Sequence, residues 1–352
     1  MIMSVASFLK SSQIVSDIIV LTRVMNETVK RMIKAKYPRS DSPGNWVFEY
    51  KTLKWMFDPS LGRQLPLPYQ VFRAYCRLYF AIFHGHLLAG KQLFKAAASI
   101  SSLLVRQDYI RLRLKDYEVY LDYSDPRFLQ VVNELTSNQA DNRALSNLLA
   151  EGDTFIDVGA NHGSFSIVAS KLVGAKGCVV AIEPQPRLAS AIEKSLALNA
   201  QCSFQVHQMA LGDDDGEIEL MIPCDTSGSA GIYPGHSGTH KHRTIIVPLR
   251  RFDEAVDWQY FPGKSLIKLD IEGSEYVFLK GARRMIASLK PNLLVEINPR
   301  TLKASGVTGG DLKHLLIEFG YGQYAELKSL QETLPIENLD IQRHRNILVC
   351  PI

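Results

Sequence analysis

A glycine-rich turn preceded by an acidic residue is the first part of the sequence whose residue types suggest binding chemistry. It reads Asp157-Val-Gly159-Ala-Asn161-His-Gly163 and follows a short apolar run. Glycines at 159 and 163 let the backbone turn tightly and approach a ligand. Asp157 can accept a hydrogen bond from an ammonium or from loop amides. The glycines are four residues apart, so the turn differs from the GxGxxG pattern of a nicotinamide dinucleotide site.

Two further strand ends carry groups that suit a nucleoside. The second apolar run ends in Glu183-Pro184, 26 residues after Asp157, where an acidic side chain can accept both hydroxyls of a ribose. The third leads to Met209 and Ala210, which can flank an adenine ring. A solvated carboxylate and a core methionine are the plainer interpretations of these positions. The three strand ends together predict a cofactor site formed by Asp157, Gly159, Asn161, Gly163, Glu183, Met209 and Ala210.

A pair of carboxylates follows the fourth apolar run, in Lys268-Leu-Asp270-Ile-Glu272-Gly273. Because ligands of open α/β sheets bind at the carboxyl ends of the strands, Asp270 and Glu272 should face the cofactor. We assign them as the catalytic residues, since a carboxylate there can take a proton from an acceptor. It could also bind the acceptor or a divalent cation. In the plainer alternative Asp270 only orders the loop and Lys268 only pairs with a carboxylate. No residue is assigned as a metal ligand.

The elements that position these groups alternate between short apolar runs and helical segments. We predict strands at 155–158, 178–182, 204–206, 266–269 and 293–297, and helices at 166–173, 187–200 and 274–288. Buried strands that alternate with helices predict a parallel α/β sheet with helices on both faces. A strand at 117–123 and a helix at 128–149 lead into it.

From residue 115 onward the sequence resembles the FkbM family of methyltransferases. The resemblance is carried by the 157–163 turn, by Glu183-Pro184, by 268–275, by Leu279-Lys-Gly-Ala282, by Leu294-Val-Glu-Ile297 and by Asn346-Ile-Leu-Val349. It implies a Rossmann-like methyltransferase fold with a mostly parallel seven-stranded sheet. It also implies S-adenosylmethionine as methyl donor and, usually, O-methylation of a hydroxyl. By position, Asp157, Gly159, Asn161, Gly163 and Glu183 would hold the donor.

Charge divides the chain into two regions. Residues 1–115 carry 18 Lys/Arg and 6 Asp/Glu, a net charge of +12, and residues 116–352 carry 22 and 30, a net charge of −8. We therefore predict a basic, mainly helical region at 1–115 and a methyltransferase domain at 116–352. The first region contains predicted helices at 12–37 and 69–106, with a linker at 38–43. It has no apolar run of the roughly 18 residues that span a bilayer, so it is expected to pack on the domain, form a homodimer or lie on a membrane surface.

A long segment between two predicted strands, 217–222 and 244–247, is expected to be a lid or binding loop. This segment, 223–243, is rich in glycine and contains His236, His240 and His242, and loops longer than about 12–15 residues are often functional. A histidine there could act as a base, although a solvated loop is the plainer interpretation. His162 is interpreted as incidental.

The remaining composition restricts the function classes. The five cysteines contain no CxxC pair, and the first residues lack a secretory signal, so a cytoplasmic protein is expected. The acidic domain makes nucleic acid an improbable acceptor. We expect a hydroxyl on a glycan, a lipid-linked sugar or a secondary metabolite. Two other classes stay open: a membrane-associated adaptor with an inactive methyltransferase-like domain, and an NAD-dependent oxidoreductase.

Overall fold

The computed structural model describes residues 53–83, 90–105, 108–136, 140–223, 227–233 and 242–351. The chain divides into two compact units, Met1–Arg106 and Gln107–Ile352. The helix and the linker predicted over 12–43 lie outside the described residues. The predicted domain boundary, after residue 115, falls in the turn of a hairpin in the second unit.

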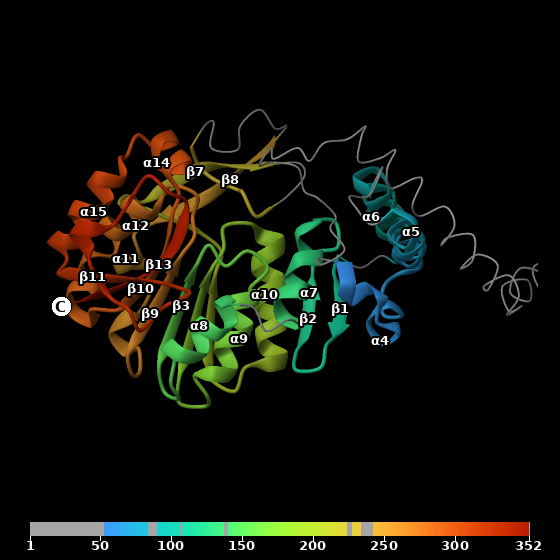
Figure 1. Ribbon diagram of the computed structural model, residues 1–352, viewed down its shortest axis with the longest axis horizontal. Coiled ribbons are helices and arrows are strands. Elements are labelled where there is room, and N and C mark those ends of the chain that lie inside the picture. The colour runs from blue at the N-terminus through green and yellow to red at the C-terminus, as the bar shows by residue number, and fades with distance from the viewer. Residues whose placement is uncertain are drawn as a thin grey trace, which may run out of the picture. The chain divides into compact units, whose positions relative to one another are not determined.

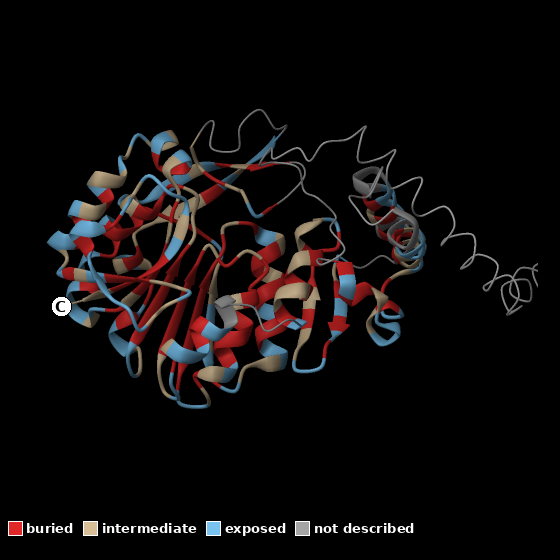
Figure 2. Ribbon diagram, in the orientation of Figure 1, coloured by how far each residue is buried: buried red, intermediate tan, exposed pale blue. Residues whose placement is uncertain are grey.

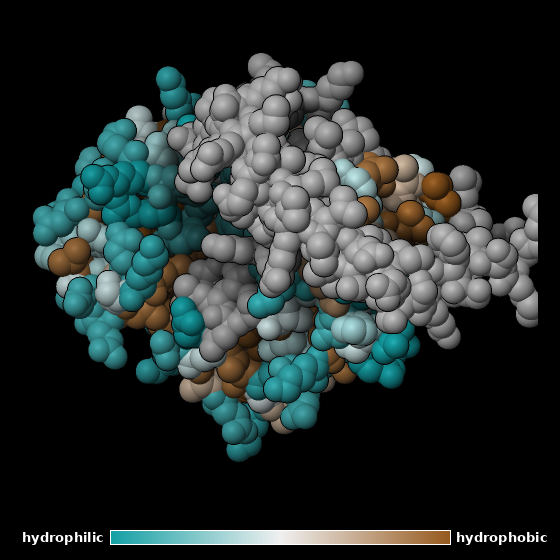
Figure 3. All heavy atoms as spheres, turned by 45° about the vertical axis from the view of Figure 1, so that its right-hand side comes forward, coloured by the Kyte–Doolittle hydropathy of each residue, from teal (hydrophilic) through white to brown (hydrophobic). Residues whose placement is uncertain are grey.

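The described part of the first unit is helical. It contains η1 (Lys54–Phe57), α4 (Pro59–Gly62), α5 (Leu67–Phe83) and α6 (Gly90–Val105), so the stretch predicted as one helix holds two. The ring of Phe94 on α6 packs edge-on against Tyr69 of α5 at 5.5 Å between centroids. Apolar side chains also lie on the surface of this unit (Figure 3), among them Leu67, Val71 and Leu78 of α5. No helix in the described ranges is both long enough and apolar enough to cross a bilayer.

The second unit begins with a hairpin and two helices. Strands β1 (Ile110–Arg113) and β2 (Glu118–Leu121) pair antiparallel, and α7 (Arg127–Thr136) and α8 (Ala140–Leu148) follow. The predicted strand at 117–123 contains β2, whereas β1 was not predicted. The hairpin is fixed to the domain because the backbone N–H of Tyr120 donates to Ser195 Oγ at 2.9 Å and that of Glu118 donates to Asn199 Oδ1 at 3.0 Å.

A mixed sheet forms the centre of this unit (Figure 1). Its strands are β3 (Thr154–Val158), β4 (Cys178–Ile182), β5 (Ser203–His207), β9 (Ser265–Leu269), β10 (Asn292–Ile297), β11 (Tyr321–Glu326), β12 (Leu334–Pro335) and β13 (Arg345–Pro351). The spatial order is β12-β11-β13-β10-β9-β3-β4-β5. The five strands from β5 to β10 are parallel, and β13 runs antiparallel to both β10 and β11.

The predicted Rossmann-like, mostly parallel sheet with helices on both faces is confirmed. It has eight strands instead of seven because the two-residue β12 pairs with the edge of β11. Numbered in chain order without β12, the strands run 3-2-1-4-5-7-6. The dinucleotide-binding order is 3-2-1-4-5-6, so this sheet differs by a reversed last strand inserted between the fifth and the sixth.

Helices cover the two faces of the sheet. On one side α9 (Ser164–Leu172) packs on β3 and β4, with α7, α8 and α10 (Pro186–Asn199) against it. The other side carries α11 (Phe252–Ala255), α12 (Glu275–Gly281), α13 (Arg283–Leu289) and α15 (Gly309–Glu318). The central strands β3, β4 and β9 are buried along both faces (Figure 2). Three short elements complete the unit: η2 (Trp258–Tyr260), α14 (Pro299–Ala304) and η3 (Ile336–Asn338).

Alternation along the strands decides which side chains approach the site. Ile156, Val158, Ile267 and Leu269 enter the core that contains Phe278 of α12. Because successive side chains of a strand point to opposite faces, Asp157 and Lys268 point to the α9 side. They are direct neighbours, since β3 and β9 pair Asp157 with Lys268.

A separate three-stranded sheet adjoins the main one. It consists of β6 (Ala210–Leu211), β7 (Gly216–Pro223) and β8 (His242–Arg250), in the order β6-β8-β7, and has its own small core around Leu220, Ile222 and Val247. The predicted loop at 223–243 is bounded by β7 and β8. Within it, Gly231 forms a bridge to Met221, so the described part of this segment folds back toward β7.

Candidate active site

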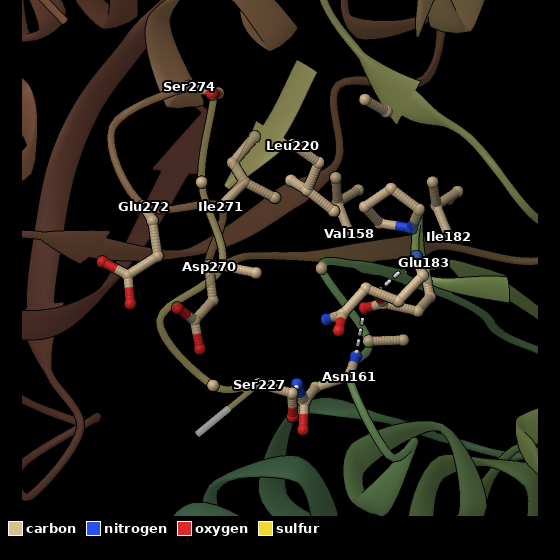
Figure 4. A pocket seen from close by; sticks show the side chains of 18 of the residues that line it. Val158, Asn161, Ile182, Glu183, Leu220, Ser227, Asp270, Ile271, Glu272 and Ser274 are labelled. Atoms are coloured by element: carbon tan, nitrogen blue, oxygen red, sulfur yellow. Dashed lines mark hydrogen bonds between the residues drawn. The ribbon is translucent and has the colours of Figure 1, made fainter. Parts of the chain in front are cut away.

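A pocket lies at the carboxyl ends of β3, β4 and β9, between the main sheet and the three-stranded sheet. It encloses about 920 Å³, part of which is open to solvent. The residues after each strand line it, together with Leu220 and residues of the segment from Ser227 to Ile232. Figure 4 shows Asp270 and Glu272 projecting side by side at one end, with Glu183 and Asn161 at the other.

The turn after β3 approaches the loop after β9 closely at Gly159. Its φ is +80°, and a Cβ atom there would lie 2.2 Å from the backbone oxygen of Asp270. The N–H of Gly159 donates to Ile182 O at 3.0 Å, which ties the turn to the end of β4. Only glycine satisfies both the left-handed conformation and the close approach. The predicted glycine therefore lets two strand ends meet at the pocket.

Asn161 and Glu183 form the polar part of the other end. Asn161 has a φ of +54°, a conformation that asparagine tolerates better than most residues. Its N–H donates to Glu183 Oε2 and that of Gln185 donates to Oε1, both at 2.8 Å. Burial raises the pKa of Glu183 to about 7. Asn161 Oδ1 is buried without a hydrogen-bond partner among the described residues, so it is available to accept from a ligand.

Asp157 and Gly163 lie behind the pocket surface and are not among the residues that line it. Asp157 accepts hydrogen bonds from the N–H and Oγ of Ser166, at 3.1 and 2.7 Å. Its other oxygen has no hydrogen-bond partner in the described ranges and lies 3.8 Å from Lys268 Nζ. Gly163 precedes α9 with a φ of +76°, and a Cβ there would lie 2.9 Å from Ile192. Both residues therefore stabilise the turn without lining the pocket.

Met209 and Ala210 line the pocket together with Leu211 and Ile182. All four are buried and apolar. They form an apolar region of the pocket that Glu183 also lines, and an aromatic ring of a ligand could fill it.

The two predicted catalytic carboxylates are brought together but differ in charge state. Lys268 Nζ donates to Asp270 Oδ2 at 3.1 Å. Enclosure would raise the pKa of Asp270, but the Lys268 ammonium outweighs this effect and lowers it. Burial, with repulsion from Glu296 and Asp270, raises the pKa of Glu272 to about 9. At neutral pH, therefore, Asp270 is the ionised carboxylate and Glu272 is protonated.

Glu296 of β10 completes an acidic cluster with these two residues. One carboxylate oxygen from each of Asp270, Glu272 and Glu296 lies within 4.8 Å of the others. Two basic side chains contact the cluster, because Lys268 pairs with Asp270 and His344 Nε2 lies 2.6 Å from Glu296 Oε1. The pattern at 268–273 indicated only two of the three carboxylates, because Glu296 reaches the site through the pairing of β10 with β9.

Several residues that contribute to the pocket were not predicted. Arg127 of α7 lines it, as does Ser227, whose Oγ accepts from Asn161 Nδ2 at 2.9 Å. His162 lines it with a fully buried ring whose Nε2 lies 3.1 Å from Asp125 Oδ2. Of the loop histidines, His242 is exposed at the start of β8, and His236 and His240 lie outside the described residues. These contacts join segments distant in sequence, and no local pattern predicts them.

Comparison with known proteins gives a family for this region. Residues 157–322 match the sequence model of the Methyltransferase FkbM domain. A curated relative, Methyltransferase 1 of Beauveria bassiana (strain ARSEF 2860), is 25% identical over 163 residues, which cover 41% of this chain and 65% of the relative. The chain therefore spans less than two thirds of that protein.

Solved structures with a detectable similarity include the following three. Methyltransferase FkbM from Methylobacillus flagellatus KT has 16% identity, covers 82% of this chain and 72% of its own, and has a TM-score of 0.37. Aeropyrum pernix fibrillarin, in complex with S-adenosyl-L-methionine, has 12% identity, coverages of 58% and 68%, and a TM-score of 0.32. An S-adenosylmethionine-dependent O-methyltransferase from Thermotoga maritima has 12% identity, covers 69% of this chain and 77% of its own, and has a TM-score of 0.31. The match over 157–322 identifies this part of the chain as a domain of the FkbM methyltransferase family.

Proposed function

We propose that the protein transfers a methyl group from S-adenosylmethionine to a hydroxyl group of its acceptor. The observation that carries this proposal is an ionised carboxylate, Asp270, that lines the pocket and is held by Lys268 at 3.1 Å. The family membership of residues 157–322 supports the methyl transfer. The carboxylate supports the choice of a hydroxyl acceptor, because an alcohol must lose its proton as its oxygen is alkylated.

The residues of the pocket suit the donor. Glu183 offers carboxylate oxygens to a ribose diol, and the apolar region around Met209 and Ala210 suits an adenine ring. Asn161 Oδ1 is a buried acceptor with no partner in the described part of the chain, which a donor group of the ligand would satisfy. Gly159 lets the turn after β3 lie directly against the backbone of Asp270, so both can line the same pocket. Asp157 and Gly163 would act by holding this turn in place.

The chain's own groups would then align the reactants and take up the proton. When bound, the donor supplies an electrophilic methyl on a sulfonium, and transfer in line to the acceptor oxygen leaves a neutral thioether. The acceptor's proton passes to Asp270, whose carboxylate Lys268 keeps ionised. Glu272, protonated at neutral pH, is a hydrogen-bond donor and not a base. Alignment and exclusion of water supply most of the acceleration in such a displacement.

The two other function classes are less well supported by the same observations. An oxidoreductase that uses NAD would be expected to carry GxGxxG and the 3-2-1-4-5-6 strand order. The sequence lacks that glycine pattern, and the sheet formed by the described residues has the order 3-2-1-4-5-7-6 when β12 is left out. An adaptor with an inactive domain would not need the Lys268–Asp270 pair or the glycine at 159.

A transfer assay with radiolabelled methyl donor tests the proposal. The purified chain is incubated with panels of sugars, lipid-linked sugars and phenols, and in parallel with amines matched in size. Label in an alkali-stable ether of a hydroxyl compound supports O-methylation. Label confined to amines would contradict the choice of acceptor while leaving methyl transfer intact. We also propose that the acceptor is a glycan, a lipid-linked sugar or a secondary metabolite, and that residues 1–115 contact a membrane surface or a second copy of the chain.

A further inference from the structure

Arg127 is a cation of the pocket that neither the sequence patterns nor the family match assigns. It is the first residue of α7 and lines the pocket at the side of Val131, Ser164 and Phe165. Its guanidinium Nη1 donates to Glu134 Oε1 at 2.7 Å. The side chains of Arg127 and Glu134 are 18% and 12% exposed, so the pair is enclosed by the protein but open on one side.

Hydrogen bonds hold Arg127 and its partner Glu134 in place. Its backbone N–H donates to Asp125 Oδ1 at 3.1 Å, which fixes the start of the helix. Glu134 is held from its other oxygen, which accepts from Ser164 Oγ at 2.7 Å. Ser164 is the first residue of α9, directly after the 157–163 turn. Glu134 thus fixes the guanidinium relative to the turn on which the donor would lie.

Most of the donors of Arg127 are unused. A guanidinium carries five N–H donors in a planar fork, and one nitrogen, Nη1, is hydrogen-bonded to a described residue. The other lysine or arginine among the pocket-lining residues is Lys268, which is committed to Asp270 at 3.1 Å and lies 3.8 Å from Asp157. Among the described residues, Arg127 is paired with Glu134 through Nη1 alone, so an anionic group entering the pocket would find unused N–H donors on its guanidinium.

From this geometry we propose that Arg127 binds a carboxylate of a ligand through its unused N–H donors. The inference rests on the proposed function, because the methyl donor itself carries a carboxylate on its methionine part. With the ribose at Glu183, that part extends toward the end of the pocket that holds Asp270, and the charge of Arg127 acts on Asp270. The donor's α-carboxylate is the source that we favour. A carboxylate on the acceptor presents the same chemistry and is distinguished by the experiment.

The test compares S-adenosylmethionine with decarboxylated S-adenosylmethionine, which lacks only the carboxylate. Calorimetry is performed on the full chain and on R127M, R127K and the control R283M. Arg283 has the same charge and pairs with Glu318 at 2.9 Å outside the pocket. Wild type should prefer the intact donor about 10- to 100-fold, the range of charge-assisted hydrogen bonds. R127M should reduce this preference to about threefold or less while binding the decarboxylated donor as wild type does. R127K should fall between, because lysine lacks the bidentate fork, and R283M should match wild type.

The second arm titrates benzoate into the protein saturated with S-adenosylhomocysteine. If the carboxylate comes from the acceptor, R127M keeps the donor preference and loses benzoate binding. An R127M protein that keeps the preference and binds benzoate as wild type does would overturn the inference. Equal loss of both donors would also overturn it, because it would indicate a purely structural role. If wild type itself binds neither donor, the proposed function fails, a result that the variants cannot produce.

Discussion

Lys268 and Asp270 form a hydrogen-bonded ion pair inside the pocket, with Nζ 3.1 Å from Oδ2. Lys268 lies on β9 and Asp270 directly after it, two residues further along the chain. Both side chains lean to the α9 side of the sheet, where Lys268 also faces Asp157 of the neighbouring strand. The Lys268 ammonium thus interacts with two carboxylates, the buried Asp157 behind the pocket and Asp270 within it. The Lys-x-Asp spacing of the sequence corresponds to this arrangement.

The charge states of Asp270 and Glu272 predict opposite results for two isosteric changes. D270N removes the base and should lower kcat about 100-fold or more, with binding of S-adenosylhomocysteine within about threefold of wild type. E272Q mimics the protonated acid already present and should keep kcat within about threefold at pH 7.5. Steady-state kinetics and calorimetry measure both. A large loss in E272Q with an unaffected D270N would reverse the assignment.

The pH dependence of K268M tests how Lys268 acts. Lys268 lowers the pKa of Asp270, and the reaction needs this carboxylate ionised, so wild type should lose activity only as pH falls through that low pKa. Without the ammonium the pKa rises, and the acidic limb of the kcat profile should move to higher pH. K280M is the matched control, since Lys280 pairs with Asp213 outside the pocket. A reduced rate with an unmoved limb would mean that Lys268 only supports the fold.

Replacing Gly159 tests whether the close approach of two strand ends forms the donor site. In G159A a Cβ would lie 2.2 Å from Asp270 O at a φ of +80°, so the turn must move away. Binding of S-adenosylhomocysteine should weaken about 100-fold or more, since a displacement of the turn removes several contacts together. G216A is the control, because a Cβ at Gly216 meets nothing within 4 Å. Unchanged affinity in G159A would place the donor elsewhere.

The raised pKa values of the buried glutamates predict a stability that falls as pH rises. Burial raises the pKa of Glu183 and of Glu275 to about 7 and that of Glu272 to about 9, from 4.5. Between pH 4.5 and 9 the native state therefore holds more protons than the unfolded state, so the free energy of unfolding decreases with pH. The Tm of the ligand-free protein should drop from pH 5.5 to 8.5. E272Q should reduce that drop, and the exposed E193Q should not.

The order of strands and helices around the motifs was largely predictable from the sequence. The five apolar runs at 155–158, 178–182, 204–206, 266–269 and 293–297 are strands within one residue at each end. Four of them are followed by a helix, and the run at 204–206 is followed by the strand β6. The prediction of one helix over 274–288 was wrong, because the structure has two helices there, α12 and α13. The carboxylate of Asp253 accepts from the N–H groups of Arg284 and Met285, which starts α13 anew after α12. That contact crosses 31 residues.

The sequence indicated many of the residues around the pocket, but not which of them line it and which lie behind it. Asp157 was expected to contact the ligand, yet alternation along β3 places it behind the pocket against Ser166. Lys268 lies beside Asp157 because β9 pairs with β3. A single sequence does not show which strands pair. Arg127 and Glu296 were missed for the same reason. Each reaches the pocket through packing of an element whose own sequence shows only a helix or a strand.

Calorimetry with S-adenosylhomocysteine and with NAD distinguishes a methyl-donor site from a dinucleotide site. The pocket combines a carboxylate for a ribose at Glu183, a glycine turn that departs from the dinucleotide pattern and a strand order with a reversed seventh strand. We predict that the purified chain binds S-adenosylhomocysteine at a single site in the micromolar range and gives no heat with NAD under the same conditions. Binding of NAD by a folded chain that does not bind S-adenosylhomocysteine would show that the pocket is not a methyl-donor site.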